Sequence, residues 1–370
     1  MVPALCASAL ETANPKATPA AKAILEYYGS LASKPEQRLL TGQFIGYNSG
    51  VKPAMLETIK AKVGDQVAIV GGDYADYGGS HHVAYEKTNT ALLAAWKAGA
   101  LVALQIHMTD PAGVGLRSPA TDLGLLLAPG NPAYDKWMAQ MDLIAAGLRQ
   151  LQDNGVVVLF RPFHEMNGAW FWWGGKDPAV FTRLWKRMFD YFTVTKGLNN
   201  ILWVYGPNHG TRPDRWYPGP EYVDITGLDA YTSNIGPAGI QGYPDMIRLG
   251  KPFGFTEFGP ENAENPSGDF DYRKFVGGMK SSFPNAVFFM SWDGDWSLAS
   301  NQFVAEALKD PYVSNRSALP ANWGVGASLA GRGRPRGPGY GIGSGGTAGV
   351  SIFKTGSGSW VDMRGRATGY

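Results

Sequence analysis

The sequence contains one cysteine, Cys6, among 370 residues, and it lacks both long apolar runs and blocks of like charge. A single cysteine excludes an internal disulfide and a zinc site built from cysteines. No uninterrupted apolar stretch approaches the ~20 residues that cross a bilayer, so we expect no membrane partner. The 33 basic residues exceed the 31 acidic residues by only two, which argues against binding of nucleic acid through phosphate contacts. A neutral partner fits this composition better.

Several cofactor and metal signatures are also missing. The five histidines show neither His-x-His nor His-Glu-x-x-His spacing, and no serine lies in a Gly-x-Ser-x-Gly turn. No Gly-x-Gly-x-x-Gly turn follows the first expected strand, which argues against a dinucleotide-binding fold. We therefore expect neither a metal nor a cofactor. What the chain does have in excess is tryptophan, 12 residues, whose flat rings either stack on sugars and bases or fill a large core.

From about residue 35 to residue 310, short β-rich runs alternate with longer segments of helical period, which indicates repeated βα units and a parallel sheet. Eight runs read as strands. They span residues 39–45, 67–71, 101–106, 156–160, 201–205, 224–228, 252–256 and 286–290. Eight strands with intervening helices over this length predict an α/β fold of the (β/α)8 TIM-barrel type.

Two helices between these strands have clear boundaries. Residues 132–153 begin with Asn131 as N-cap and a proline in the first turn, and they end at Asn154-Gly155. Residues 178–195 follow the same pattern, with Asp177 as the cap. Both place apolar side chains on one face at helical spacing, so we expect each to pack against the barrel.

Both ends of the chain differ from this body. Residues 1–20 contain a short apolar stretch ending in Ala7-Ser8-Ala9, which fits either the remnant of a signal peptide or a disordered terminus. Residues 321–370 contain 15 of the 49 glycines and six basic residues against one acidic residue. We expect this Gly- and Arg-rich C-terminal tail to be disordered, and residues 21–320 to form the catalytic domain.

Active sites of such barrels lie where strands end and βα loops begin. Two glutamates fall there, Glu165 after the fourth strand and Glu257 after the seventh. Other polar and aromatic side chains follow the remaining strands, among them His107, Asp229, Tyr231 and Trp292.

Two carboxylates without a metal-ligand set point to acid and nucleophile chemistry on an acetal. Arg161 shares one face of its strand with Glu165 by the two-residue period, so it can reach into the barrel mouth. A nearby cation favours an ionised carboxylate, whereas desolvation favours a protonated one, and a nucleophile and an acid need that asymmetry. We expect Arg161 and Asp229 to support the site.

Three motifs carry a specific resemblance. They are Phe163-His164-Glu165-Met166-Asn167-Gly168 followed by Trp170-Phe171-Trp172-Trp173-Gly174, then Phe255-Thr256-Glu257-Phe258-Gly259, then Ser291-Trp292. Over roughly residues 35–310 the sequence resembles the β-mannanases of glycoside hydrolase family 26, whose clan more often has asparagine where this chain has His164.

The resemblance implies that Glu165 is the acid/base and Glu257 the nucleophile of a retaining reaction. It also implies that His107, His164, Tyr231 and Trp292 surround the sugar, and that Trp170 or Trp173 shapes the cleft. Because consecutive rings cannot all face one way, we expect one or two of the four rings at 170–173 in the cleft and the others in the core.

The sequence is therefore interpreted as a secreted, monomeric, retaining endo-β-1,4-mannanase that hydrolyses mannan, glucomannan or galactomannan. The catalytic pair does not encode the sugar, so a mixed-linkage β-glucanase or a β-1,3-xylanase of the same family remains an alternative. A third hypothesis is a non-catalytic carbohydrate-binding barrel.

Overall fold

The computed structural model describes residues 10–47, 50–75, 81–113, 115–117, 121–261, 266–321 and 323, together with the backbone of residues 353–354 and 360–361. The chain divides into two compact units, Met1–Gly326 and Ala327–Tyr370. In the second unit, β11 (Phe353–Lys354) pairs antiparallel with β12 (Trp360–Val361).

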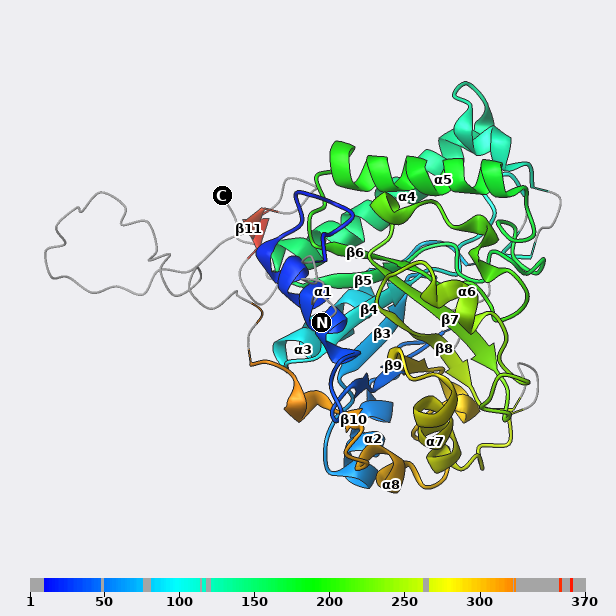
Figure 1. Ribbon diagram of the computed structural model, residues 1–370. Coiled ribbons are helices and arrows are strands. Elements are labelled where there is room, and N and C mark those ends of the chain that lie inside the picture. The colour runs from blue at the N-terminus through cyan, green and yellow to red at the C-terminus, as the bar shows by residue number, and fades with distance from the viewer. Residues whose placement is uncertain are drawn as a thin grey trace, which may run out of the picture. The chain divides into compact units, whose positions relative to one another are not determined.

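The first unit is built around a closed parallel barrel (Figure 1). Its strands are β1 (Leu39–Leu40), β2 (Gly42–Phe44), β3 (Ile69–Asp73), β4 (Leu101–Gln105), β5 (Val158–Arg161), β6 (Ile201–Tyr205), β7 (Ile225–Tyr231), β8 (Phe253–Gly259), β9 (Ala286–Ser291) and β10 (Val313–Ser314). From β2 to β9 each strand pairs in parallel with the next, and β9 closes the ring by pairing with β2. β1 pairs in parallel with β9 and β10. The short β1 continues into β2, so these two strands occupy one position of an eight-membered (β/α)8 barrel, which confirms the predicted fold.

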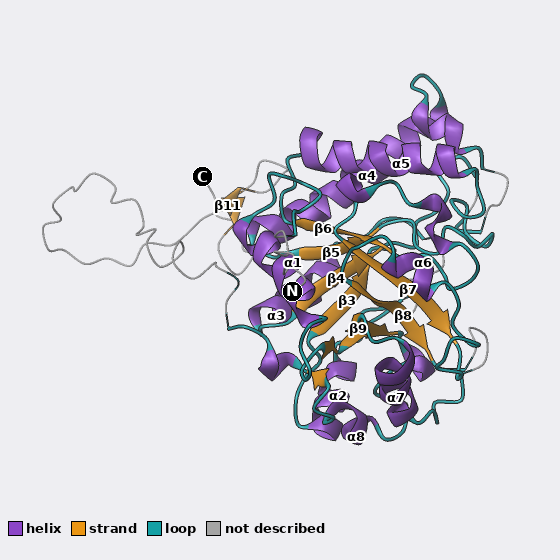
Figure 2. Ribbon diagram, viewed as in Figure 1, coloured by secondary structure: helices purple, strands orange, loops and turns teal. Residues whose placement is uncertain are grey.

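Helices surround this barrel, as Figure 2 shows. They are α1 (Pro19–Leu31), α2 (Ala54–Val63), α3 (Glu86–Lys97), α4 (Pro132–Asp153), α5 (Pro178–Asp190), α6 (Tyr243–Ile247), α7 (Tyr272–Ser282) and α8 (Val304–Leu308). The predicted caps are confirmed: Asn131 and Asp177 each accept hydrogen bonds from two backbone N–H groups of the first helical turn. The helix predicted over 178–195 continues beyond Asp190 as one π-helical turn, Tyr191–Thr195.

The barrel interior and the end at which the strands begin share one apolar cluster. Side chains of α1, such as Ile24 and Tyr28, pack with strand residues such as Leu159 and Phe288. The rings of Tyr28 and Phe288 lie 5.5 Å apart, edge to face. Because α1 fills the end at which the strands begin, the opposite end, where they finish, is the one left for a site.

The strands at the site are longer than the sequence predicts. β7 reaches Tyr231 and β8 reaches Gly259, so Asp229 and Glu257 lie within strands rather than in the loops beyond them. The pairing of β7 with β8 shifts register between Leu228 and Asp229. Such irregularities re-aim side chains next to active sites. Apolar content alone did not reveal these extensions because each begins with an acidic residue, Asp229 or Glu257.

The two predicted terminal segments, residues 1–20 and 321–370, are each only partly described by the structure. Residues 1–9 fall outside them, whereas the backbone N–H of Ala13 donates to Asp224 Oδ1 at 2.6 Å. In the segment predicted as a tail, Trp323 is 8% exposed and its ring lies 5.2 Å from that of Tyr27. The rest of that predicted tail lies outside the described residues, apart from Ala321 and the backbone of β11 and β12.

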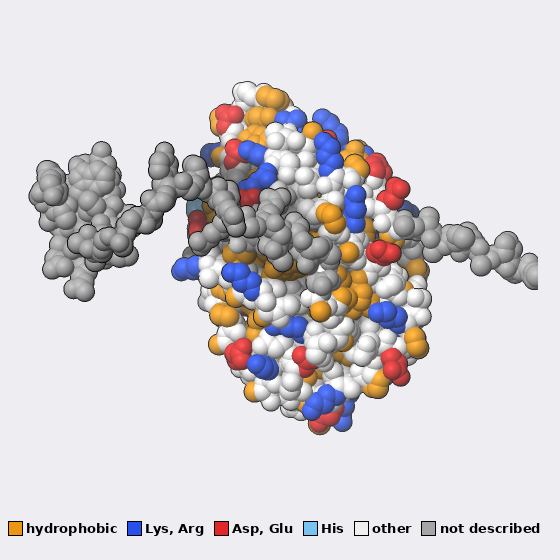
Figure 3. Space-filling model, turned by 90° about the vertical axis from the view of Figure 1, so that its left-hand side faces the viewer, with side chains coloured by type: hydrophobic (Ala, Val, Ile, Leu, Met, Phe, Trp, Pro, Cys, Tyr) orange, Lys and Arg blue, Asp and Glu red, His pale blue; other side chains and the backbone are white. Residues whose placement is uncertain are grey.

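The surface carries both charge signs. Figure 3 shows lysine and arginine side chains interspersed with aspartate and glutamate over the face that it presents. In the described part of the chain, no helix has the length and apolar character needed to span a bilayer.

Candidate active site

Arg161, the last residue of β5, organises the mouth of the barrel. Its buried guanidinium donates through Nη1 to Asp229 on β7 and through Nη2 to both Glu257 on β8 and Gln105 on β4. A Cβ on Gly206 would lie 2.6 Å from Arg161 Cδ, so this position after β6 requires glycine for the arginine to cross the barrel. One cation thus holds carboxylates from two neighbouring strands.

Glu257 has a second donor. The hydroxyl of Tyr231 donates to Glu257 Oε2 at 2.9 Å, while the other carboxylate oxygen accepts from Arg161. Burial and the charge of Glu257 raise the pKa of Tyr231 well above its usual value, so this phenol remains a donor. Both oxygens of Glu257 are therefore oriented by donors that remain protonated.

Glu165 lies in a strained turn beyond β5. Its φ is 53° and that of Phe163 is 50°, a region that non-glycine residues rarely adopt. The backbone holds this conformation through Glu165 N–H, which donates to Gly206 O at 2.9 Å, and through Gly168 N–H, which donates to Glu165 O at 2.9 Å. Strain of this kind costs about 1 to 3 kcal/mol and clusters at functional sites.

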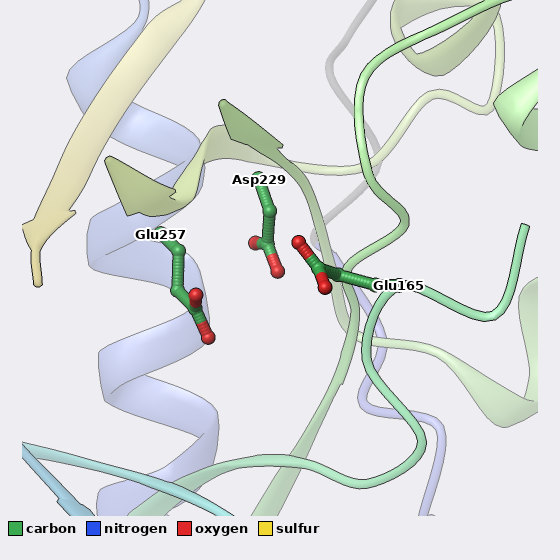
Figure 4. A group of neighbouring side chains, drawn as sticks. All are labelled: Glu165, Asp229 and Glu257. Carbon is green, nitrogen blue, oxygen red and sulfur yellow. The ribbon is translucent and has the colours of Figure 1, made fainter. Parts of the chain in front are cut away.

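The side chain of Glu165 faces the other two carboxylates, as Figure 4 shows. Carboxylate oxygens of Glu165, Asp229 and Glu257 lie within 4.8 Å of one another. The spacing is that of a metal-ligand group, but the positive charge next to it belongs to Arg161, which pairs with Asp229 and Glu257. Glu165 differs from both, because its hydrogen-bond donor is neutral, the indole Nε1 of Trp170 at 2.7 Å.

The surroundings of Glu165 favour its protonated form. Burial, followed by the nearby charge of Glu257, raises the pKa of Glu165 to about 8, and the hydrogen bond from Trp170 opposes this rise. Glu165 is therefore protonated at neutral pH, while Glu257 is held against a guanidinium. The two glutamates therefore differ in their hydrogen-bond partners, a guanidinium for Glu257 and an indole for Glu165.

Two histidines form a chain behind the carboxylates. Asp73, at the end of β3, accepts from His107 Nδ1 at 2.6 Å, and His107 Nε2 lies 2.9 Å from His164 Nε2. Burial lowers the pKa of His164 well below its usual value, so its ring is neutral. The short contact between the two Nε2 atoms places one shared hydrogen between the rings.

Aromatic rings complete the wall near Glu257. Trp292 is 6% exposed and lies 5.0 Å from the ring of Phe44 and 5.5 Å from that of Tyr47. The Tyr47 ring is itself 4.1 Å from His107. These contacts fix the position of the Trp292 ring.

The structure brings together most of the residues expected at the site, namely His107, Arg161, His164, Glu165, Trp170, Asp229, Tyr231, Glu257 and Trp292. Trp173 is the exception: it is 0% exposed, and its Nε1 donates to the backbone oxygen of His164 at 2.7 Å. Its indole supports the backbone of the turn that carries His164. The ring of Phe171 stacks on it at 4.7 Å, so Trp173 does not reach the cleft.

Three further residues take part that the sequence reading did not assign. Gln105 binds Arg161, Asp73 binds His107, and Tyr47 packs on His107. Gln105 precedes His107 by two residues, so the alternation of a strand could have placed both on one face. Asp73 and Tyr47 had no comparable signal, since each is recognised only by its contact with His107, which is distant in sequence.

The sequence matches a known protein family over most of its length. The family model described as glycosyl hydrolase family 26 matches residues 13–318. The chain belongs to glycosyl hydrolase family 26. The resemblance seen in the sequence motifs is thereby confirmed, and the chain is a glycoside hydrolase by family.

Relatives with curated names cover most of the chain. A mannan endo-1,4-beta-mannosidase of Bacillus subtilis strain 168 is 34% identical over 325 residues, which is 83% of this chain and 88% of the relative. A second such enzyme from Bacillus subtilis is 36% identical over 327 residues, or 83% and 89% of the two chains.

Solved structures of mannanases are also similar to this chain in fold. A mannanase of Bacillus subtilis superposes with a TM-score of 0.77 at 33% identity, over 83% of this chain and 96% of the other. A GH26-CBM35 beta-(1,4)-mannanase of Podospora anserina has a TM-score of 0.69 at 26% identity, over 85% and 69% of the two chains.

Proposed function

We propose that the chain is a retaining endo-β-1,4-mannanase, with mannan, glucomannan or galactomannan as substrate. The observation that carries the proposal is the pairing of two unlike glutamates at one barrel mouth, a protonated Glu165 and an Arg161-bound Glu257. Their closest oxygens lie within 4.8 Å, which suits direct attack on the sugar and leaves too little room for the water that an inverting enzyme places between its carboxyl groups. The curated names of the Bacillus subtilis relatives support mannan as the polysaccharide.

In the first step, the carboxylate of Glu257 attacks the anomeric carbon while Glu165 gives its proton to the departing glycosidic oxygen. Arg161 and Tyr231 orient the attacking carboxylate. The products are a glycosyl ester on Glu257 and a free sugar hydroxyl, so charge and protons balance. The wall formed by Trp292 and Tyr47 keeps water from the reacting carbon.

In the second step, Glu165 acts as a base toward water. Esterification removes the negative charge of Glu257, and that charge is one of the causes that raise the pKa of Glu165. The pKa of Glu165 therefore falls once the ester has formed, and the carboxylate can accept a proton from water. Water then attacks the anomeric carbon, releasing the sugar and the Glu257 carboxylate.

We also propose that the enzyme works outside the cell as a monomer. A polysaccharide is too large to cross a membrane, and both carboxylates belong to one barrel, so the site needs no second subunit.

The direct test is a reducing-sugar assay on mannan, galactomannan, lichenan, β-1,3-xylan and cellulose. Activity at least tenfold higher on the two mannans than on the others is expected. Preference for lichenan or β-1,3-xylan would replace the mannanase proposal by one of its alternatives. Binding to mannan without hydrolysis would instead support a non-catalytic barrel.

A further inference from the structure

The ring of Tyr231 occupies the space that a side chain at position 259 would fill. Tyr231 ends β7 and pairs with Gly259, the last residue of the neighbouring β8 (Figure 1). A Cβ on Gly259 would lie 2.3 Å from Tyr231 Cδ1 and 2.4 Å from Cε1, whereas real Cβ atoms essentially never come within 3.0 Å of another atom. The phenol takes its present position only because residue 259 has no side chain.

The backbone gives no other reason for a glycine at this point. The φ of Gly259 is not positive, so a residue with a side chain could adopt the same conformation. Glycine in a strand is unfavourable, because it loses more backbone entropy on folding and has no side chain to pack. It often marks a place that another group approaches closely, and here that group is the ring of Tyr231.

A second ring confines Tyr231 from another side. The indole of Trp296 meets the Tyr231 ring edge to face, with 5.8 Å between the ring centroids and 87° between the planes. Trp296 Cδ1 would lie 2.7 Å from a Cβ on Gly259, so both rings meet over the same glycine. Tyr231 is therefore held between the end of β8 and the indole.

Trp296 is tied to the barrel through its backbone. Its carbonyl oxygen accepts from the hydroxyl of Tyr272 at 3.3 Å and from that of Ser291 at 3.1 Å. Tyr272 begins α7 and Ser291 ends β9. Asn301 Nδ2 donates to the backbone oxygen of Asp295, the residue before the tryptophan, at 2.8 Å. These bonds fix the turn that carries the indole.

The position of the phenol matters because its hydroxyl reaches Glu257. Tyr231 OH donates to Glu257 Oε2 at 2.9 Å. To open the 2.3 Å contact to 3.0 Å, a Cβ at position 259 would have to push the ring by about 0.7 Å. Hydrogen bonds weaken steeply when their angle or length leaves the favourable range, so a shift of this size would misalign the hydroxyl with the carboxylate.

We propose that Gly259 and Trp296 are positioning residues of the reaction. They hold the Tyr231 ring so that its hydroxyl keeps the Glu257 carboxylate aligned for attack, and neither needs to touch the sugar. The inference rests on the proposed function, because it takes Glu257 as the nucleophile. The missing side chain at the end of β8 is thus a requirement of the site.

The test is a double-mutant cycle that measures kcat and KM on soluble galactomannan. Gly259→Ala is made in the wild type and in Tyr231→Ala, where the added Cβ no longer meets a phenol. Gly277→Ala on α7 is the matched control, since the φ of Gly277 is not positive and a Cβ there would meet nothing within 4 Å beyond its own stretch of helix. Circular dichroism and melting temperature show how much of each variant is folded.

A hydrogen bond to a charged group is worth about one to two powers of ten in a rate constant. We therefore expect Gly259→Ala to lower kcat about 10- to 100-fold in the wild type, with KM changed by less than about threefold, since no sugar contact is lost. In Tyr231→Ala the same substitution should lower kcat by less than about threefold, because the two changes act through one ring. Gly277→Ala should leave both constants unchanged.

The Trp296 pair tests the same assignment independently if Gly259→Ala does not fold. Trp296→Ala releases the Tyr231 ring and should lower kcat by roughly fivefold or more at similar KM, whereas Trp296→Phe keeps an aromatic edge against Tyr231 and should retain most of the activity. A rise in KM without a fall in kcat in Trp296→Ala would make Trp296 a sugar contact and overturn its positioning role.

Two outcomes of the cycle would overturn the role of Gly259 while leaving the mannanase function intact. They are full activity of Gly259→Ala in the wild type, and equal losses from this substitution with and without the phenol. A wild type that does not hydrolyse galactomannan would overturn the proposed function, and the positioning roles with it.

Discussion

The hydrogen bond from Trp170 to Glu165 should set the alkaline limit of activity. The indole Nε1 lies 2.7 Å from Glu165 Oε2 and stabilises the ionised carboxylate, which opposes the rise of its pKa to about 8. Phenylalanine keeps an aromatic ring at this position but has no donor. Trp170→Phe should therefore raise the pKa of Glu165 further.

The size of the shift follows from the strength of the bond. A hydrogen bond to a charged group contributes about 1.5 to 3 kcal/mol, and one pKa unit corresponds to about 1.4 kcal/mol. The alkaline limb of kcat/KM, expected near pH 8 in the wild type, should move up by about one unit in Trp170→Phe.

The assay is a pH profile of kcat/KM on soluble galactomannan between about pH 5 and 10, since this parameter reports ionisation of the free enzyme. Trp96→Phe, on α3, is the control and should leave the limb in place. A limb that stays fixed in Trp170→Phe, or moves to lower pH, would refute the assignment of Glu165 as the acid whose proton limits the reaction.

Three further outcomes follow from the same contacts. Glu165→Gln should raise the melting temperature at pH 9 but not at pH 5. The pKa of Glu165 in the folded protein, about 8, lies above the ordinary 4.5, so ionisation of this carboxyl lowers the stability of the wild type by roughly 2 to 4 kcal/mol as the pH rises through this window. An equal effect at both pH values would contradict this. Glu257→Ala should abolish turnover of every substrate, whereas Glu165→Ala should spare aryl mannosides with activated leaving groups, which need little protonation; equal losses on both substrate types would exclude the acid role. Trp292→Ala should lower kcat/KM more than tenfold, or about 1.4 kcal/mol. Because Phe44 and Tyr47 pack on Trp292, the variant should also lose about 3 kcal/mol of stability. Full activity in a well-folded variant would exclude a role as sugar platform.

The barrel could be predicted because its signals are local. Strand and helix periodicity, together with the caps Asn131 and Asp177, depend on neighbours in sequence, and the structure places these elements where they were expected. The positions of Glu165 and Glu257 followed from the rule that barrel sites gather at strand ends.

The finer arrangement of the site depends on contacts between distant strands. That Arg161 binds Glu257 and leaves Glu165 to the indole of Trp170 is a choice between two carboxylates 92 residues apart in sequence, and no periodicity encodes it. The burial of Trp173 beneath His164 likewise follows from the turn at residues 163–168. The sequence does not indicate this turn, because the residues with positive φ, Phe163 and Glu165, are not glycines.

The most direct test of the central claim is to trap the covalent intermediate. A 2-deoxy-2-fluoro-β-mannosyl fluoride forms the glycosyl ester quickly and releases it slowly, so the labelled residue can be found by peptide mass spectrometry. We expect one label per chain, on Glu257, in the wild type and none in Glu257→Ala. A label on another residue, or hydrolysis of mannan with release of the inverted anomer and no label, would contradict a retaining reaction with Glu257 as its nucleophile.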